Sequence, residues 1–155
     1  ATGLMVKSRM LEDTKAPKRG DTRPDLAGID YRGLADQLAM QYRPGDTVIA
    51  LAPLALRFYT GIRGDYFLQT VTGRKVVFDP NQPKSVYVDK YVGNPVLRSR
   101  AEFEAVLSRS SRVWLWCAPY FGFTDVVDRE TRDSIERRFR LVTETYDGKL
   151  YLWEQ

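Results

Sequence analysis

The sequence predicts an α/β fold, a three-layer sandwich whose mostly parallel, Rossmann-like sheet ends in a C-terminal antiparallel β-hairpin. Two short and almost wholly apolar runs, residues 47–52 (TVIALA) and 112–118 (RVWLWCA), are typical of strands covered on both faces. Segments with helical spacing alternate with such runs. Near the end of the chain, residues 140–145 and 149–153 flank Tyr146-Asp147-Gly148, and Asp-Gly is a preferred pair for a tight hairpin turn.

The chain divides into two parts. Residues 1–28 are rich in Lys, Arg, Asp, Pro and Gly and lack a sustained apolar period, so we interpret them as a linker or disordered tail. Residues 29–155 are expected to form a single α/β domain. The chain has 155 residues, 43% of them hydrophobic, which is enough for one core without disulfides or metal.

The first half of the domain predicts helix, strand and helix. Behind Asp30, a candidate N-cap, apolar residues recur at helical spacing (Tyr31, Leu34, Leu38 and Tyr42), and Pro44-Gly45-Asp46 ends that helix. The strand at 47–52 follows. After Pro53 a short helical pattern runs through Leu54, Phe58 and Tyr59 to Gly61.

The middle of the domain predicts short strands and one helix. Residues 66–71, 75–78 and 85–88 are rich in β-branched and aromatic side chains, with a Thr72-Gly73 turn between the first two. The S-x-x-E spacing of residues 99–102 is that of a capping box, and the helix that follows carries an apolar stripe (Phe103, Val106 and Leu107).

The strand at 112–118 is expected to be central, because both of its faces are apolar. Trp114 and Trp116 share one face, and Val113, Leu115 and Cys117 share the other. After a loop at 119–127, residues 129–139 predict a charged helix that turns Ile135 and Phe139 inward.

The residue types exclude several chemistries. The chain has no histidine, which removes imidazole bases, and its single cysteine, Cys117, excludes disulfide scaffolds. It has no glycine-rich phosphate loop of the usual kinds. Asp125 and Asp128 could hold a hard cation, but carboxylates at the start of a helix more often cap it. We therefore expect no cofactor, no metal and no catalytic residue.

The charge pattern argues against nucleic acid as a partner. Of the 24 basic and 20 acidic side chains, six and three respectively lie in residues 1–24, so the predicted domain is nearly neutral despite the net charge of +4. Nucleic-acid readers concentrate positive charge on the folded surface.

A candidate ligand site lies at the ends of the two central strands. Both end in Ala-Pro, at 52–53 and 118–119, and ligands of open α/β sheets collect beyond the carboxyl ends of strands. If these ends are neighbours, Arg57, Tyr59, Tyr120 and Asp125 line one crevice. Alternatively, the prolines only end the strands and the tyrosines pack over the rim of the sheet.

Several segments resemble a known family. Residues 30–36 (DYRGLAD) and 42–48 (YRPGDTV) are similar to the D-[WY]-R-G-x-A…P-G-D-x-[IV] run that begins the soluble C-terminal domain of many polytopic bacterial membrane glycosyltransferases. These form the dolichyl-phosphate-mannose protein mannosyltransferase-like (GT-C) group, related to the aminoarabinose transferases of lipid A. Residues 112–116 (RVWLW), 139–142 and 150–153 match in order.

The resemblance implies a non-catalytic accessory domain on the periplasmic or extracellular side, anchored in the membrane through the rest of its polypeptide. The family uses a lipid-phosphate-linked sugar as donor, and its catalytic carboxylates lie in loops between membrane helices, so none is carried over to this chain. The implied partners are the membrane-embedded part of the same polypeptide and the lipid-linked sugar or acceptor. The alternative is a free-standing α/β module that binds a small anionic ligand, such as a sugar phosphate.

Overall fold

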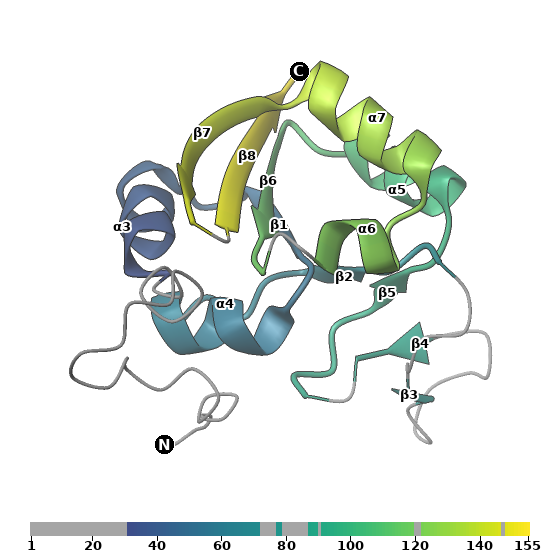
Figure 1. Cartoon of the computed structure of the whole chain (residues 1–155), viewed down its shortest axis with the longest axis horizontal. Helices are drawn as coiled ribbons and strands as arrows, with labels where there is room; N and C mark the ends of the chain where they lie inside the picture. Colours follow the sequence, from purple (N-terminus) through teal and green to yellow (C-terminus); the bar gives the residue numbers. More distant parts are fainter. Residues whose placement is uncertain (1–30, 72–76, 79–86, 90, 120–121, 147) are drawn as a thin grey trace.

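The domain is built on one six-stranded mixed sheet (Figure 1). The computed structural model describes residues 31–71, 77–78, 87–89, 91–119, 122–146 and 148–155. The strand order is β5-β2-β1-β6-β8-β7. In that order the strands are Val96–Leu97, Tyr66–Leu68, Thr47–Ala50, Arg112–Cys117, Gly148–Glu154 and Arg140–Thr145. The first four strands are parallel, and β8 and β7 form an antiparallel hairpin on β6. The predicted α/β class, mostly parallel sheet and C-terminal hairpin are confirmed.

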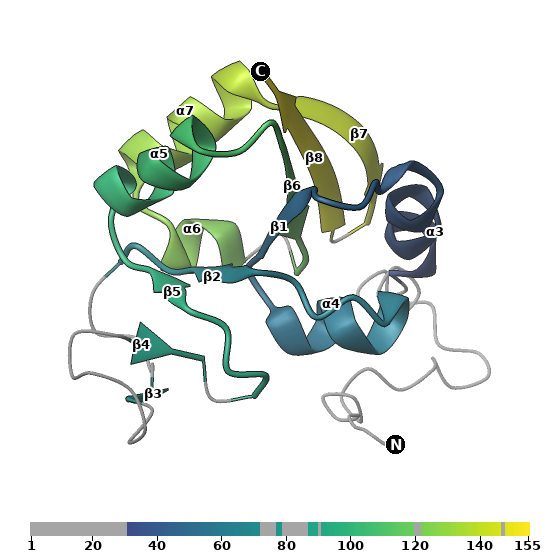
Figure 2. The same cartoon turned by 180° about the vertical axis from the view of Figure 1, so that it is seen from behind.

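Helices cover both faces of the sheet (Figures 1 and 2). On one face α3 (Arg32–Gln41) and α4 (Pro53–Thr60) enclose a core cluster that includes both buried tryptophans. On the other face α5 (Arg100–Ser108), α6 (Phe123–Val126) and α7 (Arg129–Arg138) enclose a second cluster. None of the described helices has the length and apolar character needed to cross a bilayer.

Strand β6 is the centre of the fold, as its sequence predicts. All six of its residues are buried. Trp114 and Trp116 belong to the core under α3 and α4, whereas Val113, Leu115 and Cys117 belong to the core under α5 and α7. The period of two in a strand thus supplies side chains to both layers of helices.

The predicted helices are present, and their ends follow ordinary capping chemistry. Ser99 Oγ accepts a hydrogen bond from the Glu102 N–H at 3.1 Å, which is half of the predicted capping box. Glu102 Oε1 accepts its bond from the Arg98 N–H, one residue before the cap. The N-cap of α3 is Tyr31, and the proposed cap Asp30 lies outside the described residues.

The middle of the chain differs from the prediction. Strand β2 ends at Leu68. Gln69 N–H still donates to Leu97 of β5, but the next two amides, of Thr70 and Val71, donate to Val126 of α6 instead. Strands β3 (Val77–Phe78) and β4 (Tyr87–Val88) form a separate antiparallel pair. The predicted Thr72-Gly73 turn lies outside the described residues.

The structure contains two elements that the sequence analysis did not predict. The loop expected at 119–127 contains the four-residue helix α6, and the two-residue strand β5 extends the sheet beyond β2. Helix α6 has four residues and β5 has two, and elements this short do not show a hydrophobic period, which needs a window of about eleven residues or more.

The contact between α3 and the hairpin provides a test of the packing. A Cβ at Gly148 would lie 2.5 Å from Leu34 Cδ1, which is fully buried, and 3.2 Å from Ala118 Cβ. We expect Gly148→Ala to lower the free energy of unfolding by about 2 kcal/mol through overpacking, as measured by urea denaturation.

Gly122→Ala is the matched control. A Cβ at Gly122 meets nothing within 4 Å, and the residue has an ordinary φ of −70°. Its effect should stay within about 0.5 kcal/mol, and equal effects of the two substitutions would contradict the packing of α3 on the hairpin.

Candidate functional site

The carboxyl ends of β1 and β6 lie side by side. The two strands pair in parallel from Thr47↔Val113 to Ala50↔Trp116, and Leu51 N–H then donates to the Trp116 carbonyl at 3.0 Å. The two Ala-Pro sequences at 52–53 and 118–119 therefore follow neighbouring strands, as the candidate site requires. The peptide bond between Ala118 and Pro119 is cis.

This edge of the sheet is a topological switch point. From β1 the chain passes through α4 to β2 on one side, and after β5 it returns through α5 on the opposite face to β6 on the other side. The connection that leaves β1, through α4, therefore lies on one face of the sheet, and the connection that enters β6, through α5, lies on the other face (Figures 1 and 2). Open α/β sheets bind ligands at such a point.

Helix α4 begins at this edge with free backbone donors. Its N-cap is Ala52, which has no side-chain cap, and its first residue is Pro53, which has no N–H. The Leu56 N–H already bonds to the Ala52 carbonyl at 3.1 Å. Within the described part of the chain, the N–H groups of Leu54 and Ala55 make no hydrogen bond. This helix end therefore carries an uncompensated partial positive charge.

Gln69, which the sequence analysis missed, lies at the same edge. It directly follows β2 and is only 6% exposed. No hydrogen bond of its side-chain amide is found among the described residues. The sequence did offer a signal for this residue, because Gln69 is a single amide side chain after the short apolar run of β2. The prediction of one strand over residues 66–71 included Gln69 and so hid that signal.

The predicted site residues are distributed over both faces. Arg57 is exposed on α4. Tyr59 is half-buried near the far end of α4, where its ring packs edge-on against Tyr31, with the ring centroids 5.4 Å apart. Asp125 is exposed on α6, which belongs to the opposite layer. Tyr120 lies outside the described residues.

The other candidate ligands have structural roles. Asp128 caps α7, since its carboxylate accepts from the Thr131 N–H at 3.1 Å and from the Thr131 hydroxyl at 2.6 Å. Burial alone would raise the pKa of Asp128, but these hydrogen bonds outweigh it and lower the pKa. Among the residues that the structure describes, no cluster of three or more His, Cys, Asp or Glu could hold a metal ion.

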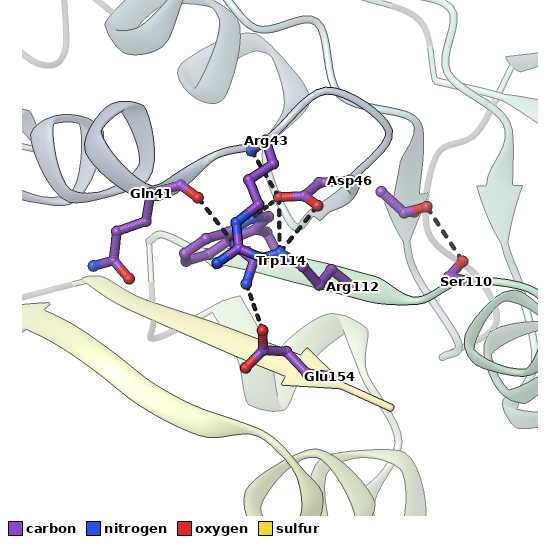
Figure 3. Close-up of polar contacts among 8 residues, drawn as sticks. Gln41, Arg43, Asp46, Ser110, Arg112, Trp114 and Glu154 are labelled. Carbon is purple, nitrogen blue, oxygen red and sulfur yellow. Dashed lines mark hydrogen bonds and ion pairs between the residues drawn. The ribbon is translucent and has the colours of Figure 1, made fainter.

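At the opposite end of the sheet, the buried charges are fully paired (Figure 3). Arg112, the first residue of β6, donates from Nε to both carboxylate oxygens of Asp46, at 3.1 and 3.2 Å. Its remaining nitrogens donate to Glu154 and, at 3.0 Å, to the Gln41 carbonyl. Asp46 also accepts from the indole N–H of Trp114 at 2.9 Å. We call these five residues the Asp46–Arg112 network.

The network keeps Asp46 ionised. Burial favours the neutral acid and by itself would raise the pKa of Asp46. Hydrogen bonds from the Arg43 N–H, the Trp114 indole and Arg112 favour the carboxylate, together with the charge of Arg112, and the net result is a pKa below the usual range. Because all three nitrogens of Arg112 donate to groups of the protein and Asp46 accepts from three residues, we interpret this end of the sheet as structural.

Comparisons of the chain with protein families, with curated proteins and with solved structures found no match.

The lowered pKa of Asp46 predicts a pH-dependent stability. A depressed carboxyl pKa stabilises the native state above the unfolded-state pKa of about 3.9, and the stabilisation is lost as the pH falls through the native pKa. Asp46→Asn removes this contribution, so the difference in unfolding free energy between wild type and variant should shrink between pH 7 and pH 3. Denaturant titrations across this range measure it. A difference that stays constant with pH would show that Asp46 is not a stabilising carboxylate.

Proposed function

We propose that this chain is a non-catalytic, extracytoplasmic accessory domain of a membrane glycosyltransferase that uses a lipid-phosphate-linked sugar. In this proposal the domain has a Rossmann-like fold and faces the periplasm or the cell exterior. It helps to position the acceptor or donor, or it stabilises the membrane-embedded part of the same polypeptide. Its resemblance to the C-terminal domains of such enzymes is the origin of the proposal.

One observation carries the proposal: separate segments of the resemblance meet in the Asp46–Arg112 network. Asp46 belongs to the P-G-D part of the pattern, and Arg112 and Trp114 belong to the R-V-W-L-W part, 66 and 68 positions away. Residues of the resemblance that bond to one another inside the core are expected to hold a folding unit together. They are not expected of a catalytic site, where such groups would face a substrate.

The carboxyl edge of the sheet supports a non-catalytic role. Glycosyl transfer needs a positioned base or acid. Among the described residues beside the ends of β1 and β6, Asp125 is exposed and the carboxylate of Asp128 is occupied as a helix cap.

A second candidate function is favoured by the free N-terminus of α4. A free-standing module that binds a small anionic ligand would use this helix end together with Arg57. The encoding reading frame separates the two functions, because an accessory domain requires several apolar segments of about 20 residues in the same polypeptide.

The accessory function predicts that the isolated 155-residue chain has no transferase activity. Incubated with a polyprenyl-phosphate-linked sugar and acceptor, it should release no more sugar than a buffer blank, because the catalytic carboxylates lie elsewhere. Mass spectrometry of the lipid product measures the turnover. Removal of the domain from the full-length protein should lower either its transfer rate or its amount in the membrane. Turnover by the chain alone would refute the proposal.

A further inference from the structure

We infer that the N-terminus of α4 and the side chain of Gln69 form a binding site for a phosphate group. This inference deepens the second candidate function, the binding of a small anion at the start of α4, and rests on it, whereas it is independent of the accessory function. It starts from two features at the carboxyl edge of the sheet that have no partner among the described residues: the backbone donors of α4 and the buried amide of Gln69.

The register of β1 and β2 places Gln69 beside the start of α4. Ile49 pairs with Tyr66 and Ala50 with Phe67, so two residues further Gln69 is level with Ala52, the N-cap of α4. Adjacent strands are about 4.8 Å apart. The Gln69 N–H continues the ladder to Leu97 at 3.0 Å, so the backbone is still extended at this position.

The alternation of side chains places Gln69 on the same face as α4. Leu68 belongs to the core under α5 and α7, so its neighbour Gln69 points to the other face. That face is covered by α4, whose Leu56 packs in the core with Ala50. The amide of Gln69 therefore lies on the side of the sheet where α4 begins.

The amide of Gln69 is available to a ligand. The residue is more than nine-tenths buried, but its amide is not among the fully buried polar groups that lack a hydrogen bond. The amide therefore still touches solvent, and its NH₂ group can donate to a ligand at the carboxyl edge of the sheet.

The charges at this corner select an anion. The N–H groups of Leu54 and Ala55 point out of the start of α4, and the first turn of the helix holds no acidic residue. Arg57 lies in the last turn of this eight-residue helix, and its exposed side chain adds positive charge to α4. Two acids of the described residues lie at this edge, Asp125 and Asp128, and both belong to the layer of helices on the other face. The carboxylate of Asp128 is occupied as the cap of α7.

These groups match a phosphate better than other ligands. Two backbone N–H groups, one amide and one guanidinium are all donors, and a phosphate offers three acceptor oxygens and negative charge. A metal cation would find no oxygen ligand among these donors except the amide carbonyl. The phosphate can come from a soluble phosphate ester or from a lipid headgroup, since both present the same acceptor atoms.

The test is a titration of the whole chain with inorganic phosphate at constant ionic strength, followed by NMR of the amides. We expect saturable shifts of the Leu54 and Ala55 N–H signals and of the Gln69 side-chain NH₂. Gln69→Leu should weaken binding about tenfold, as expected for the loss of a hydrogen bond to a charged group. Arg57→Gln should also weaken it, whereas Arg129→Gln, which removes the same charge from the start of α7, should not.

Vesicles distinguish the two sources of the phosphate. Phosphatidylcholine vesicles with and without phosphatidic acid are sedimented with wild type and with Gln69→Leu. Retention that needs both phosphatidic acid and Gln69 indicates a lipid phosphate, and a response to inorganic phosphate alone indicates a soluble ester.

A second variant guards against misfolding. Gln69→Glu keeps the shape of the side chain and should abolish phosphate binding by repulsion, and the urea midpoint of each variant reports whether it is folded. Shifts that do not saturate, shifts confined to other residues, or equal affinities of wild type and both Gln69 variants would overturn the inference.

Discussion

The ion pair between Asp46 and Arg112 is the interaction on which the rest of the structure depends. It joins the turn before β1 to the first residue of β6, and Glu154 and Gln41 extend it to the end of β8 and to α3. Burial of two charges is expensive unless the geometry satisfies both groups. Here Asp46 accepts from Arg43, Arg112 and Trp114, so the carboxylate has donors on each side (Figure 3).

This pair sets the register at the centre of the sheet. Because Asp46 directly precedes β1 and Arg112 begins β6, their contact aligns the start of both strands, and the parallel pairing from Thr47↔Val113 follows. Because both strand starts are fixed, Ala52 and Ala118, which lie six residues after Asp46 and Arg112, come to the same level. The two ends of the sheet then differ in chemistry. At the amino ends the polar groups of the network bond to one another, whereas at the carboxyl ends the first N–H groups of α4 and the amide of Gln69 make no hydrogen bond among the described residues.

The elements whose sequences show a clear local pattern were predicted correctly. The all-buried β6, the capped α5 and the hairpin of β7 and β8 were predicted from apolar alternation, a Ser-x-x-Glu spacing and an Asp-Gly pair, all of which act over a few residues. Elements that depend on distant partners were missed. Strand β5 is two residues long and exists because Phe67 and Gln69 donate to it.

The site was predicted only in part, for the same reason. The Ala-Pro ends predicted where to look, but the choice of Arg57, Tyr59, Tyr120 and Asp125 assumed one shared crevice. Tyr59 instead packs against Tyr31, and Asp125 belongs to the opposite layer. Gln69 was overlooked because its burial follows from the register between β1 and β2, which no local pattern encodes.

A double-mutant cycle on Asp46 and Arg112 tests the central claim most directly. Urea unfolding at pH 7 measures the stability of wild type, Asp46→Asn, Arg112→Met and the double variant. The coupling energy is the difference between the loss of stability in the double variant and the sum of the losses in the two single variants. If the pair anchors the sheet, each single variant loses about 3 kcal/mol and the coupling exceeds about 1.5 kcal/mol. A coupling below about 0.5 kcal/mol would show that the two residues contribute independently and that the alignment of β1 and β6 has another cause.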